Sequence, residues 1–414
     1  MIFFAMSIPL DSVLFSLKLE GLEKPVCWRA AMWNVKKKNM NNERVKLKSV
    51  ELHGFKSIHP DGQRVAFGDR TILIGANGSG KSNLVSFFKM LDFVTMGGLQ
   101  TFVQKQGGAD ALLHYGAKVT EKIEFLLTFE GGERETGYLV TMAYGMPDRL
   151  FFASERVMVQ QTALAQSEDY FIEAGKSESG LLADSAHTTS KVLSALLAGI
   201  RAYHFHDTSD TAKIKSNGYI EDARYLRADA GNLAAFLRAL KNSSDTLRYY
   251  ERIIRHIRHV MPQFRDFELE PVQANERSVM LNWSDVSHEH LFGPHQISDG
   301  SLRFMALATL LLQPPEMLPN VVVLDEPELG LHPAAVAELA GMIRSASRYC
   351  QVIVATQSIA LVDEFQVEEL VVTEWDELHC RTVFRSLDEE LLREWLERYT
   401  LSELWEKNVL GGRP

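Results

Sequence analysis

The stretch Gly75-Ala76-Asn77-Gly78-Ser79-Gly80-Lys81-Ser82 decides the fold class of this chain. It fits the pattern G-x-x-x-x-G-K-S, in which small residues let consecutive backbone N–H groups curl around phosphate oxygens. The apolar run Thr71-Ile72-Leu73-Ile74 before it is typical of a buried strand, and the chain from Asn83 to Leu91 continues with helical spacing. The order strand, loop, helix predicts a phosphate-binding loop, in which the positive end of the helix dipole faces the anion.

Two side chains of this loop have expected roles in binding a nucleotide. Lys81 is expected to reach the β- and γ-phosphates, and the hydroxyl of Ser82 is expected to ligate Mg²⁺. The pattern therefore predicts ATP and Mg²⁺ as ligands. A glycine turn ahead of an ordinary helix would give the same pattern, so the rest of the chain must decide between the two interpretations. The predicted ATP-binding residues are Gly75, Ala76, Asn77, Gly78, Ser79, Gly80, Lys81, Ser82 and Asn83.

A second segment, Val321 to Pro327 with the sequence VVVLDEP, supports the nucleotide interpretation. Its apolar residues predict a buried strand, and two carboxylates follow at the C-terminal end, where α/β sheets bind their ligands. We expect Asp325 to hold Mg²⁺ through water and Glu326 to polarise the attacking water. Alone, the acidic pair would suit a polar loop; after a phosphate-binding loop, it favours nucleotide hydrolysis.

Composition and charge narrow the class of protein. The 414 residues are 46% hydrophobic, which is ordinary for a soluble globular chain. A net charge of −10 means that binding to nucleic acid would need a local basic patch. The three cysteines are far apart and form no CxxC motif, which suits a reducing cytosol and gives no zinc motif. Because no uninterrupted apolar run reaches the roughly 18 residues of a membrane span, we expect a cytoplasmic protein without a membrane partner.

The remaining segments predict further strands and helices around these motifs. The strands Ile123 to Phe129 and Gly137 to Thr141 flank Gly131-Gly132 and predict a hairpin. Apolar residues at helical spacing occupy Ser301 to Leu312 and Ala334 to Ser345. The predicted division is 1–44 for a tail or misassigned start, 45–155 for the N-terminal part of the domain, 156–265 for a helical lobe and 266–414 for the C-terminal part.

Three shorter segments complete the pattern. Ile297-Ser298-Asp299-Gly300-Ser301-Leu302-Arg303 opens a helix just upstream of the acidic strand, and by itself it would also suit a simple N-cap by Ser298 or Asp299. Glu328-Leu329-Gly330-Leu331-His332-Pro333 follows the acidic pair. Ala355-Thr356-Gln357-Ser358 ends the next predicted strand.

The order and spacing of these motifs resemble those of standalone RecF/SMC-like, ABC-type AAA ATPases. The resemblance covers roughly Val45 to Pro414, including Tyr203-His204-Phe205-His206-Asp207 and the ending Glu403-Leu404-Trp405-Glu406-Lys407-Asn408. It implies an α/β fold, an ABC-type P-loop NTPase head. Such a head has a mixed sheet with flanking helices and an antiparallel β subdomain, here with an inserted helical lobe.

The resemblance also implies roles for the shorter segments. The segment from Ile297 resembles the ABC signature, the segment from Glu328 resembles the D-loop, and the segment from Ala355 resembles the switch. The signature residues would bind the γ-phosphate of ATP held by another subunit, and the D-loop would touch that subunit. Lys81, Glu326 and the switch residue Gln357 would be catalytic; because the switch usually carries His and Gln cannot take a proton, hydrolysis is expected to be slow or conditional. Gln104 or Gln106 would serve the Q-loop. The signature residues are Ser298, Asp299, Gly300 and Ser301, and the D-loop residues are Leu329, Gly330, Leu331 and His332.

Three functions are compatible with such an ATPase. The first is a switch that forms a homodimer around ATP and senses or regulates a separately encoded effector, as in anti-phage and toxin-like modules. The segment from Asp388 to Trp405 could dock that effector, or could pack on its own domain. The second is a RecF-like repair ATPase, in which Arg248, Arg252 and Arg255 grip DNA, although they also suit a solvated helix face. The third, the ATPase of a membrane transporter, fits poorly, since its signature is usually richer in glycine and its switch carries His.

Overall fold

The structure is a computed structural model that describes residues 44–161, 166–172, 174–184, 187–272 and 275–413. The predicted N-terminal extension, 1–44, lies outside the described residues except for its last position, as does Cys27.

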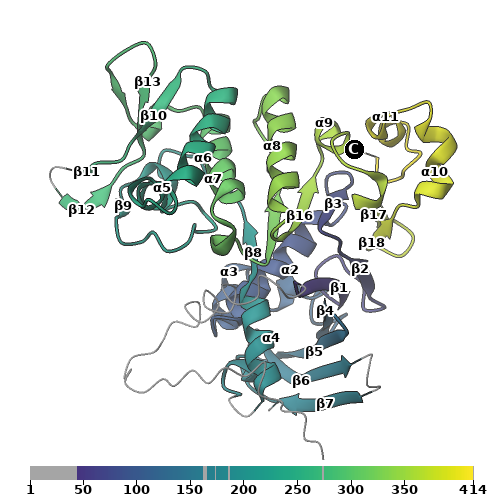
Figure 1. Ribbon diagram of the computed structural model, residues 1–414. Coiled ribbons are helices and arrows are strands. Elements are labelled where there is room, and N and C mark those ends of the chain that lie inside the picture. Colours follow the sequence, from purple (N-terminus) through teal and green to yellow (C-terminus); the bar gives the residue numbers. More distant parts are fainter. Residues whose placement is uncertain (1–43, 162–165, 173, 185–186, 273–274, 414) are drawn as a thin grey trace, which may run out of the picture.

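A six-stranded sheet in the order β18-β17-β3-β16-β15-β8 forms the centre of the molecule (Figure 1). Its neighbouring strands are parallel except for the antiparallel pair β17–β18. β15 and β16 are buried along their whole length, as expected of parallel strands covered on both faces. The bounds are β3 Arg70–Ile74, β8 Ile200–Tyr203, β15 Val321–Asp325, β16 Gln351–Thr356, β17 Leu370–Asp376 and β18 Arg381–Ser386.

A second six-stranded sheet, in the order β2-β1-β4-β5-β6-β7, is antiparallel throughout and lies below the first in Figure 1. β4 and β5 form the predicted hairpin, with Gly131 paired to Arg134 across the turn. The bounds are β1 Lys46–His53, β2 Gln63–Ala66, β4 Lys122–Gly131, β5 Arg134–Gly145, β6 Arg149–Gln161 and β7 Gln166–Ile172.

Helices cover both faces of the central sheet, and a lobe with two small sheets extends from one side (Figure 1). The helices are α2 Lys81–Val94, α3 Leu99–Lys105, α4 Thr188–Ala198, α5 Leu233–Asn242, α6 Leu247–Val260, α7 Asp299–Leu312, α8 Pro333–Ala346, α9 Ile359–Val362, α10 Glu389–Leu396 and α11 Leu401–Glu406. The small sheets contain β9 Gly218–Tyr219, β10 Phe264–Glu268, β11 Pro271–Val272, β12 Asn275–Val279, β13 Asn282–Asp285 and β14 Leu291–Phe292.

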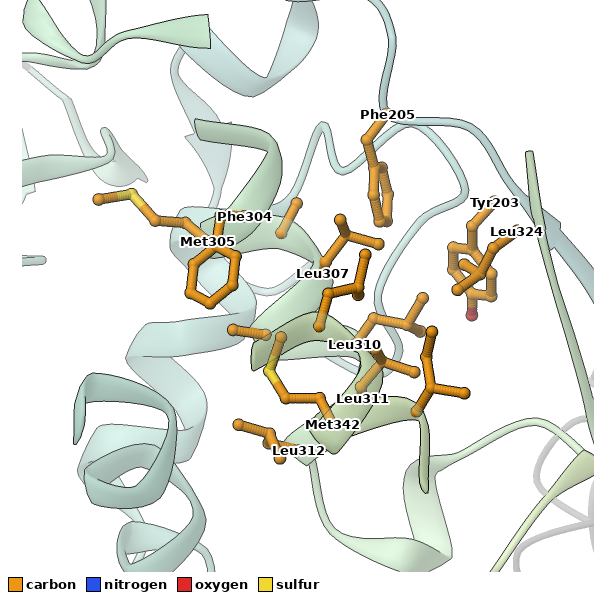
Figure 2. Close-up of a cluster of buried hydrophobic side chains, with 14 of the residues drawn as sticks. Tyr203, Phe205, Phe304, Met305, Leu307, Leu310, Leu311, Leu312, Leu324 and Met342 are labelled. Carbon is orange, nitrogen blue, oxygen red and sulfur yellow. The ribbon is translucent and has the colours of Figure 1, made fainter. Parts of the chain in front are cut away.

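The central sheet separates two hydrophobic cores. Along β15, Val322 and Leu324 face the core built around α7 and α8, while Val321 and Val323 face the core that contains α2. Figure 2 shows side chains of α7, including Leu307, gathered beside β8 and β15. Because α7 and β15 are packed together, the segments at their ends are held at fixed positions.

α2 lies between the two large sheets. The Phe87 ring meets Phe125 of β4 edge-on, with centroids 5.1 Å apart. On its other side the helix packs against β8 and β15. The helix that starts at the phosphate loop is therefore fixed from both directions.

The segment 156–265 differs from the expected helical lobe. Besides helices it contains the end of β6, all of β7, and β8, which belongs to the central sheet. The four residues of β8 are too few for periodicity to separate strand from helix, and their position comes from pairing with β15 much later in the chain. The inserted lobe holds α5 and α6 together with strands β9 to β14, so it is not wholly helical.

Among the described residues, no helix is both long and apolar enough to cross a membrane.

Candidate nucleotide-binding site

The phosphate loop connects the end of β3 to the start of α2, as the motif predicts. Gly80 is the N-cap of α2 with φ of 110°, a left-handed conformation that favours glycine. A Cβ at Gly80 would lie 2.0 Å from Thr382 Oγ1, and one at Gly75 would lie 2.2 Å from Thr373 O. The glycines thus let the loop pass close to the β17–β18 hairpin.

The hairpin also holds the loop by hydrogen bonds. Thr382 Oγ1 donates to Ser79 O at 2.8 Å, and Thr382 N donates to Ser57 O at 2.9 Å. Asn83 Nδ2 in the first turn of α2 donates to Ser57 Oγ at 2.6 Å. Thr382 could not be recognised from the sequence, because it reaches the loop only through the pairing of β18 with β17 and of β17 with β3.

Lys81 spans the loop from the inside. Its side chain is almost fully buried, and its Nζ donates to Gly75 O at 2.5 Å and to Ala76 O at 2.9 Å. Burial lowers the pKa of Lys81, while the neighbouring carboxylates Glu326, Asp325 and Glu328 act in the opposite direction. The ammonium group is therefore close to the loop, with acidic side chains nearby.

An open pocket of about 350 Å³ lies over the loop. Glu326 contributes to its wall from the end of β15, so the structure brings the predicted base and the phosphate loop to one cavity. The other lining residues are Asn77, Gly78, Ser79, Gly80, Lys81, Ser82 and Asn83.

Asp325 ends β15 beside this pocket and is 8% exposed. Burial raises the pKa of its carboxyl, but His204, 3.6 Å away, and Lys89 outweigh this and hold the pKa below its usual value. Within the described part of the chain, nothing donates a hydrogen bond to its buried Oδ1. An ionised carboxylate with an unused oxygen, together with the Ser82 hydroxyl, fits the oxygen ligands that Mg²⁺ prefers.

Glu326 and Gln357 are in direct contact. Gln357 Nε2 donates to Glu326 Oε1, and Gln357 N donates to Glu328 Oε1 at 3.3 Å. Glu326 has φ of 43°, a left-handed conformation that a non-glycine residue rarely adopts. Because β15 and β16 are neighbouring parallel strands, the residues that follow them meet at one edge of the sheet.

Glu328 holds the segment that carries Gln357 in place. Its Oε1 accepts a hydrogen bond from Thr356 Oγ1 at 2.5 Å in addition to the one from Gln357 N. Burial raises the pKa of the Glu328 carboxyl, although the hydrogen bonds from Thr356 and Gln357 act in the opposite direction. The carboxylate thus fixes the backbone of the switch.

The signature and the D-loop pack on each other instead of lining the pocket. Ser298 is the N-cap of α7 and accepts a hydrogen bond from Ser301 N at 3.2 Å. A Cβ at Gly300 would lie 2.2 Å from Gly330 O. Arg303 Nη1 donates to Leu329 O at 2.8 Å. The N-cap interpretation of Ser298 is thus confirmed, while its role toward a second chain stays a prediction.

Arg303 further joins the signature helix to the loop after β8. Its Nε donates to Phe205 O at 3.2 Å and its Nη2 to His206 O at 3.0 Å. His206 Nε2 in turn contacts Asp325 O at 2.9 Å. Sequence reasoning did not single out Arg303 or the two histidines; the only signal was the position of His204 and His206 within the quoted family motif.

We predict that alanine at Gly300 lowers the unfolding midpoint, because its Cβ would meet the backbone of the D-loop and force α7 away from it. Overpacking of this kind costs about 1–3 kcal/mol. The control is Gly341→Ala in the middle of α8, where a Cβ meets no atom of a described residue within 4 Å. That change is expected to stabilise by about 0.5–1 kcal/mol. Thermal unfolding of both variants measures the effect; equal shifts would contradict the close packing of the two segments.

The two Q-loop candidates and His332 of the D-loop do not line the pocket over the phosphate loop. Gln106 accepts a hydrogen bond from Lys56 Nζ at 2.9 Å, whereas Gln104 is exposed. His332 is the N-cap of α8, where its Nδ1 accepts from Ala334 N at 3.3 Å. The Q-loop assignment stays a prediction.

The predicted basic face of α6 is smaller than expected. Arg252 is half-buried and donates to Ser345 Oγ at 2.8 Å, so it is occupied by a contact within the chain. Arg248 and Arg255 are exposed. The buried face of the helix is formed by Tyr250, Ile253, Ile254 and Ile257. DNA binding at this helix stays a prediction that rests on two arginines.

Comparison with known proteins places this geometry in a family context. Residues 191–363 match the family model described as "AAA domain, putative AbiEii toxin, Type IV TA system". A segment of 77 residues is 36% identical to a "Putative ABC transporter ATP-binding protein" of Geobacter sulfurreducens, covering 18% of this chain and 29% of that protein. The chain thus matches less than a third of that relative's length.

Two solved structures share the fold over most of the chain. One is an Smc head bound to the C-winged helix domain of ScpA, with 16% identity, a TM-score of 0.50, and coverage of 84% of this chain and 99% of that one. The other is an Smc head with an extended coiled coil, bound to the C-terminal domain of ScpA derived from Pyrococcus furiosus, with 16% identity, a TM-score of 0.51, and coverage of 85% and 99%.

The chain has the ABC-type AAA ATPase fold of the RecF/SMC kind. The predicted fold class, an ABC-type P-loop head with a mixed sheet and an antiparallel β subdomain, is confirmed. At this level of identity the Smc structures establish the fold of this ABC-type head and leave the roles of its residues to be tested.

Proposed function

We propose that this ABC-type head is an ATP-dependent switch, which dimerises around ATP, hydrolyses it and regulates a separately encoded effector. The observation that carries the proposal is the separation of two sets of predicted phosphate ligands. The phosphate loop shares a pocket with Glu326, whereas Ser298 is exposed and does not line that pocket. The signature of a second copy would complete the site.

The residues around the pocket suit binding and hydrolysis. Lys81 donates hydrogen bonds to two loop carbonyls. Its positive charge would favour hydrogen bonds to phosphate oxygens over these when ATP binds. Ser82 and Asp325 would hold Mg²⁺, which neutralises charge on phosphate oxygens when bound. Glu326 can accept a proton from an attacking water, and Gln357 can orient that water or Glu326 but cannot take the proton. Such an arrangement supports slow or conditional turnover.

Exposed apolar side chains in two segments support contacts with a second copy and with an effector. Leu329 of the D-loop is 46% exposed next to the signature, as a contact with a second copy would require. At the C-terminal end, Leu391 and Trp395 of α10 are 79% and 46% exposed, while Trp405 of α11 is fully buried. We assign effector docking to α10 on this basis. The Smc heads of similar fold bind a domain of ScpA, and binding of any such domain here is part of the proposal.

Mixing two inactive variants tests the composite site. Lys81→Ala damages the phosphate loop and leaves the signature intact, while Ser298→Arg blocks the signature and leaves the phosphate loop intact. Neither homodimer has a complete site, but a mixed dimer has one. We therefore expect ATP turnover to appear on mixing. Turnover equal to the sum of the separate variants would contradict a site shared between two chains.

A further inference from the structure

Lys215 is a buried cation beside the signature. It ends the 3₁₀ turn Lys213–Lys215, which packs against the turn Pro294–Gln296 that leads into α7. The side chain of Lys215 is only 7% exposed. A lysine buried to this degree is unusual unless its charge has a partner.

The partners of Lys215 within the described residues are carboxylates at long range. Its Nζ lies 3.6 Å from Asp299 Oδ1 and 3.9 Å from Asp210 Oδ1. Both separations exceed a hydrogen bond, although an ammonium group carries three donors. The Nζ atom itself is not among the buried polar atoms that lack a partner, so the end of the side chain reaches solvent. A buried stem thus holds the ammonium group next to the first residue of α7, where an incoming anion could accept its hydrogen bonds.

The negative charge of Asp299 explains why a cation is needed at this position. Asp299 is the first residue of α7, where its carboxylate interacts favourably with the helix dipole. The same carboxylate would repel a phosphate arriving at this helix N-terminus, because like charges at short range raise the energy of both. A cation beside Asp299 offsets that repulsion.

We propose that Lys215 belongs to the anion site formed by the signature, together with Ser298 Oγ and the N–H groups at the start of α7. The anion is the terminal phosphate of a nucleotide held in the phosphate loop of a second copy of this chain. This inference rests on the proposed dimerisation around ATP. Lys215 does not line the pocket over its own phosphate loop, so its role concerns association and not the first binding of nucleotide.

The test uses the full chain carrying Glu326→Gln, which slows loss of the bound nucleotide by hydrolysis. Adding Lys215→Met is expected to weaken ATP-dependent dimerisation by about tenfold or more, the effect of losing one charge-assisted hydrogen bond. Lys215→Arg should retain most of the affinity. The control is Lys213→Met, in the same turn, whose side chain is 70% exposed and pairs with Asp229. It should dimerise like its parent.

A purely structural role for Lys215 would give different results. Under the proposal, Asp299→Asn alone tightens the dimer, and adding it to Lys215→Met restores part of the lost affinity, because the repulsive charge is gone. Binding of a fluorescent ATP analogue to the dilute monomer should be the same in all variants. If Lys215→Met does not fold, the Asp299→Asn variant alone still tests the proposal.

The outcomes separate this inference from the proposed function. If the Glu326→Gln parent dimerises and Lys215→Met does so equally well, or if Asp299→Asn fails to tighten the dimer, Lys215 is not a ligand. If the parent stays monomeric with ATP, the proposed function is wrong, and the role of Lys215 falls with it.

Discussion

Replacing Glu326 by Gln is expected to lower ATP turnover by about a hundredfold to ten-thousandfold, the usual contribution of a general base, while ATP binding persists. Glutamine has nearly the shape of glutamate but cannot accept the proton of the attacking water. The phosphate-loop contacts of Lys81 do not involve position 326, so the nucleotide should still bind. Phosphate release, measured beside ATP binding, reports both quantities.

The matched control is Glu316→Gln, which removes an exposed carboxylate shortly before β15. We expect this variant to turn over ATP at the parental rate. Parental turnover in Glu326→Gln would show that another group accepts the proton. Equal losses of turnover in both variants would point to a general effect of charge on the chain.

Lys81→Ala is expected to abolish nucleotide binding. Lys81 is buried at the centre of the loop, and charge-assisted hydrogen bonds to phosphate contribute about 1.5–3 kcal/mol each. Loss of two such bonds would weaken binding by roughly a hundredfold or more. Binding of a fluorescent ATP analogue, titrated into the purified chain, measures this loss.

The unfolding midpoint distinguishes this effect from misfolding. Removing a cation whose burial is unfavourable should leave the unfolding midpoint of the free protein unchanged or raise it. Lys118→Ala, at an exposed position, should bind ATP as the parent does. Parental affinity in Lys81→Ala would mean that the loop does not hold the phosphates.

Patterns of a few neighbouring residues predicted the phosphate loop and the strand β15, because in both cases the residue types directly determine the local structure. The glycine pattern from Gly75 to Ser82 requires a strand before it and a helix after it, and β3 and α2 are found there. The strand β15 was recognisable because a strand buried on both faces is apolar throughout. The contact between Glu326 and Gln357 follows once β15 and β16 are neighbours.

Contacts between distant segments could not be predicted in this way. β8 is too short to show a period and owes its place to β15. Thr382 reaches the phosphate loop through sheet pairing, and Arg303 reaches Leu329 and His206 through backbone carbonyls, which leave no mark in the residue types of the partners. Lys215 likewise looks like any surface lysine until the turn that carries it is placed against the signature.

The central claim is that ATP joins two copies of this chain. Sedimentation velocity of the Glu326→Gln variant with Mg²⁺ and either ATP or ADP tests it most directly, because the variant is expected to keep its ATP. The account predicts a dimer with ATP and a monomer with ADP. The same sedimentation coefficient with both nucleotides would contradict it.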